Sequence, residues 1–171
     1  MDTMRFYLDT EFIEAGAEHP IYLVSIGLVS EQGKEYYAES SDFPSNIANS
    51  WVREYVFSHL TWKNAKPRLQ IRQEVHEFIL DCCGMLSKTK PEFWGYYCDY
   101  DWVVFCQLFG NMASLPQGWP MYCRDIKQWC DDLGNPELPI VGKNEHNALI
   151  DAHWNYTAWH FLNNLIYVKK V

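Results

Sequence analysis

The chain has 171 residues, of which 48% are apolar, so it can bury one sizeable core but is too short for two ordinary domains. Its formal net charge of −8 argues against a passive nucleic-acid binder, because non-specific affinity comes from Lys and Arg side chains that neutralise phosphates. The charge is compatible with an enzyme that meets phosphates with bound divalent cations. We expect a single domain that spans residues 1–171.

The cysteines and the apolar runs indicate the compartment. No two of the cysteines form a C-x-x-C motif. The six are Cys82, Cys83, Cys98, Cys106, Cys123 and Cys130. The first 12 residues lack the basic and apolar regions of a secretory signal, and no apolar run approaches the roughly 18 residues of a membrane span. We therefore expect a soluble cytoplasmic protein with free thiols and no membrane partner.

The first 40 residues predict three strands. Residues 5–8 form an apolar run, residues 21–29 are rich in β-branched side chains, and residues 35–39 are again extended. A turn signal at residues 31–34 separates the second strand from the third. This order predicts an antiparallel meander.

After Ser40 the pattern becomes helical. Ser50 is expected to cap a helix at residues 51–60, and residues 68–86 carry apolar side chains at helical spacing. The later elements are expected to be a strand at 93–97, a helix at 102–109, a short strand at 121–123, a helix at 126–133 and a last helix at 147–166. Strands in a run, followed by strands that alternate with helices, predict an α/β domain with a mixed sheet.

Two carboxylates stand one residue apart at the end of the first strand. In an extended strand Asp9 and Glu11 point to the same face, so they can share one ion. A plainer interpretation is a strand that becomes polar where it reaches solvent. Like charges kept together in a half-buried place need protons, a cationic partner or a metal.

Two further carboxylates and a histidine extend this set. Asp101 follows a predicted strand and opens a predicted helix, although it could equally cap that helix, as could Asp99. Asp151 lies among apolar residues of the last helix, where a buried charge needs a partner. His146 lies five residues before it, and a lone histidine there could also be a surface residue.

Together these side chains favour a metal-dependent hydrolase. Asp9, Glu11, Asp101 and Asp151 supply hard oxygen ligands without a thiolate, which suits Mg²⁺ or Mn²⁺. A two-metal site holds its ions roughly 3.5–4 Å apart, with one generating the nucleophile and the other steadying the leaving oxygen. His146 could deprotonate the attacking water.

The order L-D-T-E-F, then Y-D followed by Val104 and Phe105, then H-N-A-L-I-D-A resembles the three motifs of the DEDDh exonuclease superfamily. That superfamily includes ribonuclease T, oligoribonuclease and proofreading exonuclease domains. Within it the chain is most similar to small bacterial 3′–5′ exoribonucleases of the RNase AS type. The similar segments include D-T-E-F-I-E, S-I-G-L-V, E-Y-Y-A, S-W-V-R and C-Q-L-F-G.

The resemblance implies an RNase H-like fold, with a five-stranded mixed sheet and helices on both faces. It also implies that Asp9 bridges two divalent cations, Mg²⁺ or Mn²⁺. Glu11 and Asp151 would complete the first site, and Asp101, preferred over Asp99 because an aromatic residue precedes it, would hold the second. His146 would be the general base.

The implied substrate is the 3′ end of single-stranded RNA, cleaved to nucleoside 5′-monophosphates. The resemblance assigns ribose contacts to backbone groups around Thr10 and Glu11. Phe12 could stack on the base or belong to the core. Further stacking candidates are Tyr97, Tyr100 and Trp102. A DNA exonuclease and a non-catalytic adaptor remain alternatives, and a homodimer is the expected assembly.

Overall fold

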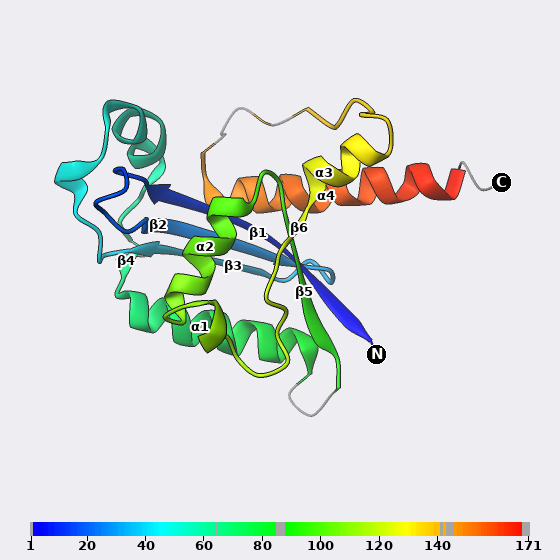
Figure 1. The fold of residues 1–171 in the computed structure, drawn as a ribbon, viewed down its shortest axis with the longest axis horizontal. Coiled ribbons are helices and arrows are strands. Elements are labelled where there is room, and N and C mark those ends of the chain that lie inside the picture. Colours follow the sequence, from blue (N-terminus) through cyan, green and yellow to red (C-terminus); the bar gives the residue numbers. More distant parts are fainter. Residues whose placement is uncertain (1, 64, 85–87, 141, 143–145, 169–171) are drawn as a thin grey trace.

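The computed structural model describes residues 2–63, 65–84, 88–140, 142 and 146–168, without the side chains of residues 167 and 168. Its sheet has the strand order β4-β3-β2-β1-β5-β6 (Figure 1). The strands are β1 Thr3–Ile13, β2 Tyr22–Ser30, β3 Glu35–Ser40, β4 Ala65–Lys66, β5 Lys90–Gly95 and β6 Arg124–Asp125. β1, β2 and β3 pair antiparallel, whereas β1–β5, β3–β4 and β5–β6 are parallel pairs. The expected mixed α/β architecture and the antiparallel meander are confirmed.

The sheet has six strands where five were expected. The additional strand, β4, contains only Ala65 and Lys66, which pair with the end of β3. The last strand lies at Arg124–Asp125 rather than at residues 121–123. Both strands have two residues, too few for the alternation that identifies a strand in sequence. Tertiary pairing alone defines them.

The helices are α1 Arg68–Cys83, α2 Asp99–Leu108, α3 Ile126–Asp132 and α4 Ala148–Val168. α2 begins three residues earlier than expected, which places Asp101 in its first turn. α1 ends before Gly84, and the expected continuation to Leu86 lies partly outside the described residues. None of the helices within the described ranges has the length and apolar character that crossing a membrane requires.

The segment expected to be an ordinary helix at residues 51–60 is irregular. It consists of a π-helical turn, Val52–Val56, followed by a 3₁₀ turn, Phe57–His59. Its start is capped by Asn49 rather than by Ser50, because the Asn49 side chain accepts a 2.8 Å hydrogen bond from the Val52 N–H. Val52 and Val56 are buried against the ends of β1 and β2. Packing therefore fixes this segment beside the end of β1.

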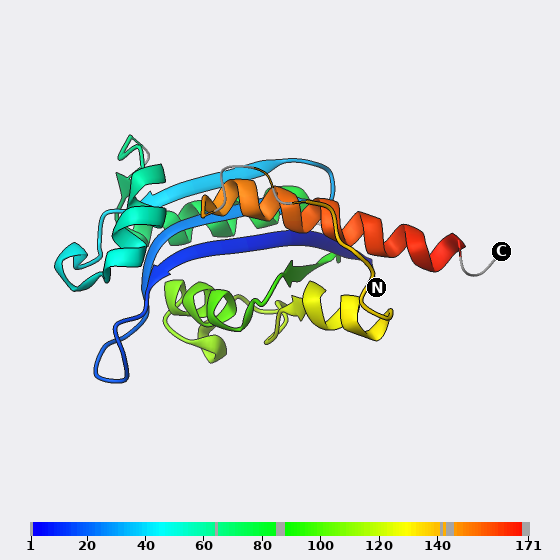
Figure 2. The same cartoon turned by 90° about the horizontal axis from the view of Figure 1, so that it is seen from above.

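Helices cover both faces of the sheet. On β1, Phe6 and Leu8 face the core shared with α1 and α2, whereas Tyr7 faces the core shared with α3 and α4. This alternation is the ordinary consequence of a strand buried on both sides. Asp9 and Glu11 continue the Tyr7 series towards α4. Figure 2 shows α4 running along the sheet and extending past the strands at its C-terminal end.

A glycine lets α4 begin close to the sheet. Gly27 of β2 is paired with Asp9 of β1, and a Cβ at Gly27 would lie 2.1 Å from the Ala148 carbonyl oxygen. A real Cβ cannot occupy that position, so the first turn of α4 can rest there only above a glycine. The close approach puts the start of α4 beside the acidic end of β1.

Candidate functional site

Three carboxylates from two distant segments meet at the end of β1. Oxygen atoms of Asp9, Glu11 and Asp151 all lie within 4.8 Å of one another. Asp9 and Glu11 share a strand face, and Asp151 comes from the first turn of α4. Three carboxylate oxygens at this spacing can coordinate one divalent cation.

Asp101 joins the group from the other side of β1. Its side chain is 8% exposed, and its Oδ1 accepts hydrogen bonds from both the backbone N–H and the hydroxyl of Thr10, each at 2.7 Å. Asp99 is exposed. Asp101 is therefore tied to β1, which favours it over Asp99 as the candidate ligand.

Thr10 holds the Asp101 side chain in place. Both of its hydrogen-bond donors are directed at Asp101, so they fix that carboxylate beside Asp9. For the predicted contact with the substrate ribose, Thr10 therefore offers only acceptors, its carbonyl and hydroxyl oxygens.

The electrostatics of the cluster fit a cation site. Burial, followed by the neighbouring Asp101, Glu11 and Asp151 carboxylates, holds the pKa of Asp9 well above its ordinary value. Burial and the charges of Asp151 and Asp101 raise the pKa of Glu11 to about 8. Burial also raises the pKa of Asp101 to about 6, against the lowering effect of the Thr10 hydrogen bonds. Divalent cations would let all of these groups ionise together.

This electrostatic arrangement predicts how stability depends on pH. A carboxyl whose pKa is raised in the folded state stabilises it below the unfolded pKa of roughly 4, and that stability is lost as the pH rises through the folded pKa. With folded values of about 6 for Asp101 and about 8 for Glu11, the metal-free protein should lose thermal stability between about pH 4 and pH 8. Thermal unfolding over this range, with EDTA and then with Mn²⁺, measures the effect. We expect Mn²⁺ to restore most of the loss at pH 8, and a flat metal-free profile would contradict the prediction.

His146 lies at the entrance to the same cluster. Its backbone N–H donates a 2.9 Å hydrogen bond to Asp151 Oδ2, and its φ of +70° lies in the left-handed region. The imidazole ring packs edge-on against Trp51, with ring centroids 4.7 Å apart, and lies 6.3 Å from the ring of Tyr55. A non-glycine residue in this conformation is held by its surroundings. The bond to Asp151 and the contact with Trp51 therefore hold His146 next to the acidic cluster.

Two pairs of aromatic side chains lie near the candidate site residues, one beside Asp101 in the chain and one against His146. Phe12 and Tyr100 stack with ring centroids 5.7 Å apart, and Tyr100 is 50% exposed. Trp51 and Tyr55, on the irregular segment, are 47% and 44% exposed. The second pair was not singled out from sequence, although its four-residue spacing was a usable signal. Its proximity to His146 depends on contacts far apart in the chain.

The other two predicted stacking residues, Trp102 and Tyr97, differ from each other in exposure. Trp102 is 9% exposed, its ring packs on Phe93 and Phe105, and its Nε1 donates to the Met121 carbonyl. The expectation that Trp102 stacks on a base is therefore wrong, because α2 turns this ring into the core. Tyr97 is 65% exposed and packs edge-on against Tyr96.

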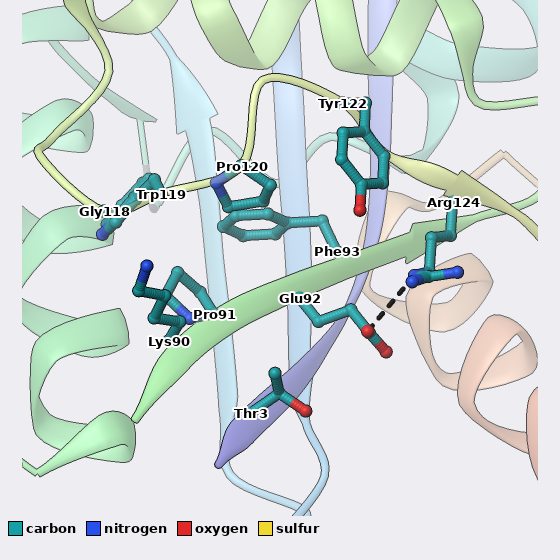
Figure 3. A pocket seen from close by; sticks show the side chains of 10 residues that line it. All are labelled: Thr3, Lys90, Pro91, Glu92, Phe93, Gly118, Trp119, Pro120, Tyr122 and Arg124. Atoms are coloured by element: carbon teal, nitrogen blue, oxygen red, sulfur yellow. Dashed lines mark ion pairs between the residues drawn. The ribbon is translucent and has the colours of Figure 1, made fainter. Parts of the chain in front are cut away.

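A cavity of about 340 Å³ lies along the first half of β5, and Figure 3 shows the side chains that line it. The acidic residues of the candidate site and His146 do not line it. Lys90, Glu92 and Arg124 do, and Arg124 forms a 3.2 Å ion pair with Glu92. It lies at the sheet edge, because β6 pairs only with Trp94 and Gly95. Lys90 and the adjacent proline discourage the addition of another strand at this edge.

The fold and the acidic cluster define an α/β domain with a candidate divalent-cation site. The family model of the 3′–5′ exoribonuclease Rv2179c-like domain matches residues 4–163. The chain therefore belongs to this exoribonuclease family. The prediction of a 3′–5′ exonuclease enzyme is confirmed at this level.

Individual relatives agree with the family assignment. The chain is 40% identical over 155 residues to the 3′–5′ exoribonuclease Rv2179c of Mycobacterium tuberculosis strain H37Rv, with 87% of each chain covered. The same values hold for the 3′–5′ exoribonuclease MT2234.1 of Mycobacterium tuberculosis strain CDC 1551. Among solved structures, one chain from the structure of the yeast NOT1 MIF4G domain co-crystallized with CAF1 aligns with a TM-score of 0.51 and 13% identity. That alignment covers 95% of this chain and 79% of the other, and it shows similarity of fold alone.

Proposed function

We propose that the protein is a metal-dependent exoribonuclease of the DEDDh type. A single exonuclease domain with an RNase H-like fold would remove nucleoside 5′-monophosphates from the 3′ ends of single-stranded RNA. The observation that carries the proposal is the convergence of Asp9, Glu11 and Asp151, with Asp101 fixed beside them by Thr10.

The residues fit two divalent cations, Mg²⁺ or Mn²⁺. Asp9 shares the cluster with Glu11 and Asp151, and the Asp101 carboxylate also raises its pKa. It would bridge two ions, with Glu11 and Asp151 on the first and Asp101 on the second. When bound, such ions supply positive charge for the developing phosphorane and acidify water. The buried oxygens of the protein fix where that charge is located.

His146 is the proposed general base. Its backbone bond to Asp151 keeps the residue beside the carboxylates, and Trp51 and Tyr55 restrict the orientation of the ring. A neutral imidazole there would accept the proton of the attacking water while the scissile phosphodiester opens.

The exposed aromatic pairs are suited to nucleobases. The half-exposed ring of Tyr100, stacked on Phe12, and the Trp51–Tyr55 pair offer flat surfaces for stacking. Base stacking is tolerant of sequence, which fits an enzyme that shortens a strand one nucleotide at a time. Backbone groups at Glu11 remain the proposed ribose contacts.

The central experiment follows 5′-labelled single-stranded RNA and DNA of one sequence with Mg²⁺, Mn²⁺ or EDTA. We expect a ladder that shortens from the 3′ end of RNA, and no ladder with EDTA. A preference for DNA would favour the alternative of a repair or proofreading exonuclease. Intact RNA and DNA in the presence of bound metal would contradict the proposal and favour an adaptor.

Replacement of the proposed base separates chemistry from metal binding. His146→Ala should slow cleavage by about 10²–10⁴-fold, the usual contribution of general acid–base catalysis. Mn²⁺ affinity, measured by calorimetry, should change little because the metal ligands remain. His153→Ala is a matched control, since His153 is on the exposed side of α4 and pairs with Glu35. Equal rates for the His146 variant and the control would exclude His146 as the base.

The assembly and the compartment stay predictions. We propose a homodimer and a cytoplasmic location. Light scattering of the purified protein and fractionation of cells are the respective measurements.

A further inference from the structure

We propose that Asn155 is a positioning residue that sets the register of α4 along β1 and thereby completes the metal site. Asn155 is 1% exposed, and its Nδ2 donates a 2.9 Å hydrogen bond to the carbonyl oxygen of Leu8. Leu8 immediately precedes Asp9 in β1. The inference rests on the proposed metal site and adds a residue that does not touch the ions.

The contact lies just beyond the point where β1 stops pairing with β5. The pairing of β1 with β5 ends at Tyr7 and Trp94, so the backbone beyond that point needs other donors. Asn155 meets the next carbonyl of β1 with its side-chain amide. A buried amide used in this way ties the two elements at a specific residue, which apolar packing alone does not do.

The same face of α4 carries both the anchor and a metal ligand. Asp151 and Asn155 are four residues apart, which places them on one side of a helix. Asp151 reaches Glu11 and Asp9, and Asn155 binds the residue before Asp9. Because the helix turn between them is rigid, the Asn155 bond and the close contact at Gly27 together determine how far Asp151 extends over β1.

This geometry predicts an effect that depends on the ion. Mg²⁺ requires nearly ideal octahedral geometry at 2.0–2.1 Å, whereas Ca²⁺ accepts flexible coordination at 2.3–2.6 Å. A shift of α4 by a fraction of an ångström should therefore weaken Mg²⁺ binding more than Ca²⁺ binding. Loss of a supporting hydrogen bond around a metal site typically costs about 10- to 100-fold in affinity or activity.

The test measures Mg²⁺ and Ca²⁺ binding by calorimetry for the wild-type protein, Asn155→Leu and Asn155→Ser. Leucine is similar in size but lacks the donor, and serine is too short to reach Leu8, so one variant suffices if the other does not fold. We expect Mg²⁺ affinity to fall about 10- to 100-fold in both, with Ca²⁺ affinity changed much less. At saturating Mg²⁺, kcat should fall while KM for RNA stays near its wild-type value.

Leu162→Ala is the matched control, because Leu162 is fully buried on α4 but packs among apolar side chains away from the carboxylates. It should lower the unfolding temperature and leave Mg²⁺ affinity unchanged. If the Asn155 variants lose stability as this control does and keep their Mg²⁺ affinity, Asn155 has only a packing role and the inference is wrong. A wild-type protein that binds neither Mg²⁺ nor Mn²⁺ would instead contradict the proposed function itself.

Discussion

Asp9→Asn is expected to abolish RNA cleavage while raising the thermal stability of the metal-free protein. Asp9 is the carboxylate that interacts with Asp101, Glu11 and Asp151, and burial with these charges holds its pKa well above normal. The amide resembles the protonated acid in size, so it removes repulsion without leaving a cavity. It also removes the negative oxygen that would bridge the ions. Function and stability should therefore change in opposite directions.

Three measurements on the metal-free and Mn²⁺-loaded proteins check this expectation. Cleavage should fall by more than about 10³-fold, since removing a bridging ligand disrupts both ion positions. The unfolding temperature without metal should rise by roughly 2–4 °C for each kcal/mol of repulsion relieved. The rise on adding Mn²⁺ that we expect for the wild-type protein should largely disappear. Asp99→Asn is the control, because Asp99 is exposed in the same region.

An Asp9→Asn protein that cleaves RNA at the wild-type rate would remove Asp9 from the catalytic set. A variant that is inactive and also less stable than the wild-type protein would show that the charged form of Asp9 supports the fold. That second result would contradict the electrostatic account of the cluster.

Gly27→Ala, a substitution in the neighbouring strand β2, is expected to disrupt the site by displacing α4. The added Cβ would lie 2.1 Å from the Ala148 oxygen and 2.5 Å from the Leu149 nitrogen, so α4 must move away from β2. Backbone atoms cannot rotate out of the way as a flexible side chain can. We expect the displacement to separate Asp151 from Asp9 and Glu11, with at least about a 10²-fold loss of activity, as for misplacement of about 1 Å.

Metal titration and thermal unfolding distinguish this displacement from general unfolding. Gly27→Ala should fold with a lower unfolding temperature, by a cost typical of overpacking, about 1–3 kcal/mol. Its Mn²⁺ affinity should fall together with its activity. Gly142→Ala is the control, because no atom of the described residues lies within 4 Å of a Cβ placed there. Unchanged Mn²⁺ affinity in a folded Gly27→Ala protein would mean that α4 does not need the close contact.

The local pattern of apolar residues in the sequence was sufficient to predict most of the strands and helices. The meander of β1, β2 and β3 and the helices α1, α3 and α4 follow from apolar periodicity. The two-residue strands β4 and β6 have no period of their own, and the segment after Asn49 forms irregular turns where a regular helix was expected. Those features arise from contacts with distant parts of the chain.

By itself the sequence determined that Asp9 and Glu11 share one face of a strand, because side-chain alternation is a local property of extended backbone. It also provided the ordered set of Asp101, His146 and Asp151. Only the tertiary structure decided which aspartate of α2 faces the site, because Thr10 binds Asp101 across 91 residues of sequence. The same holds for Trp102, buried by the orientation of α2, and for Asn155, which meets Leu8 across 147 residues. Periodicity specifies the face of an element, whereas the distance between two elements depends on the packing between them.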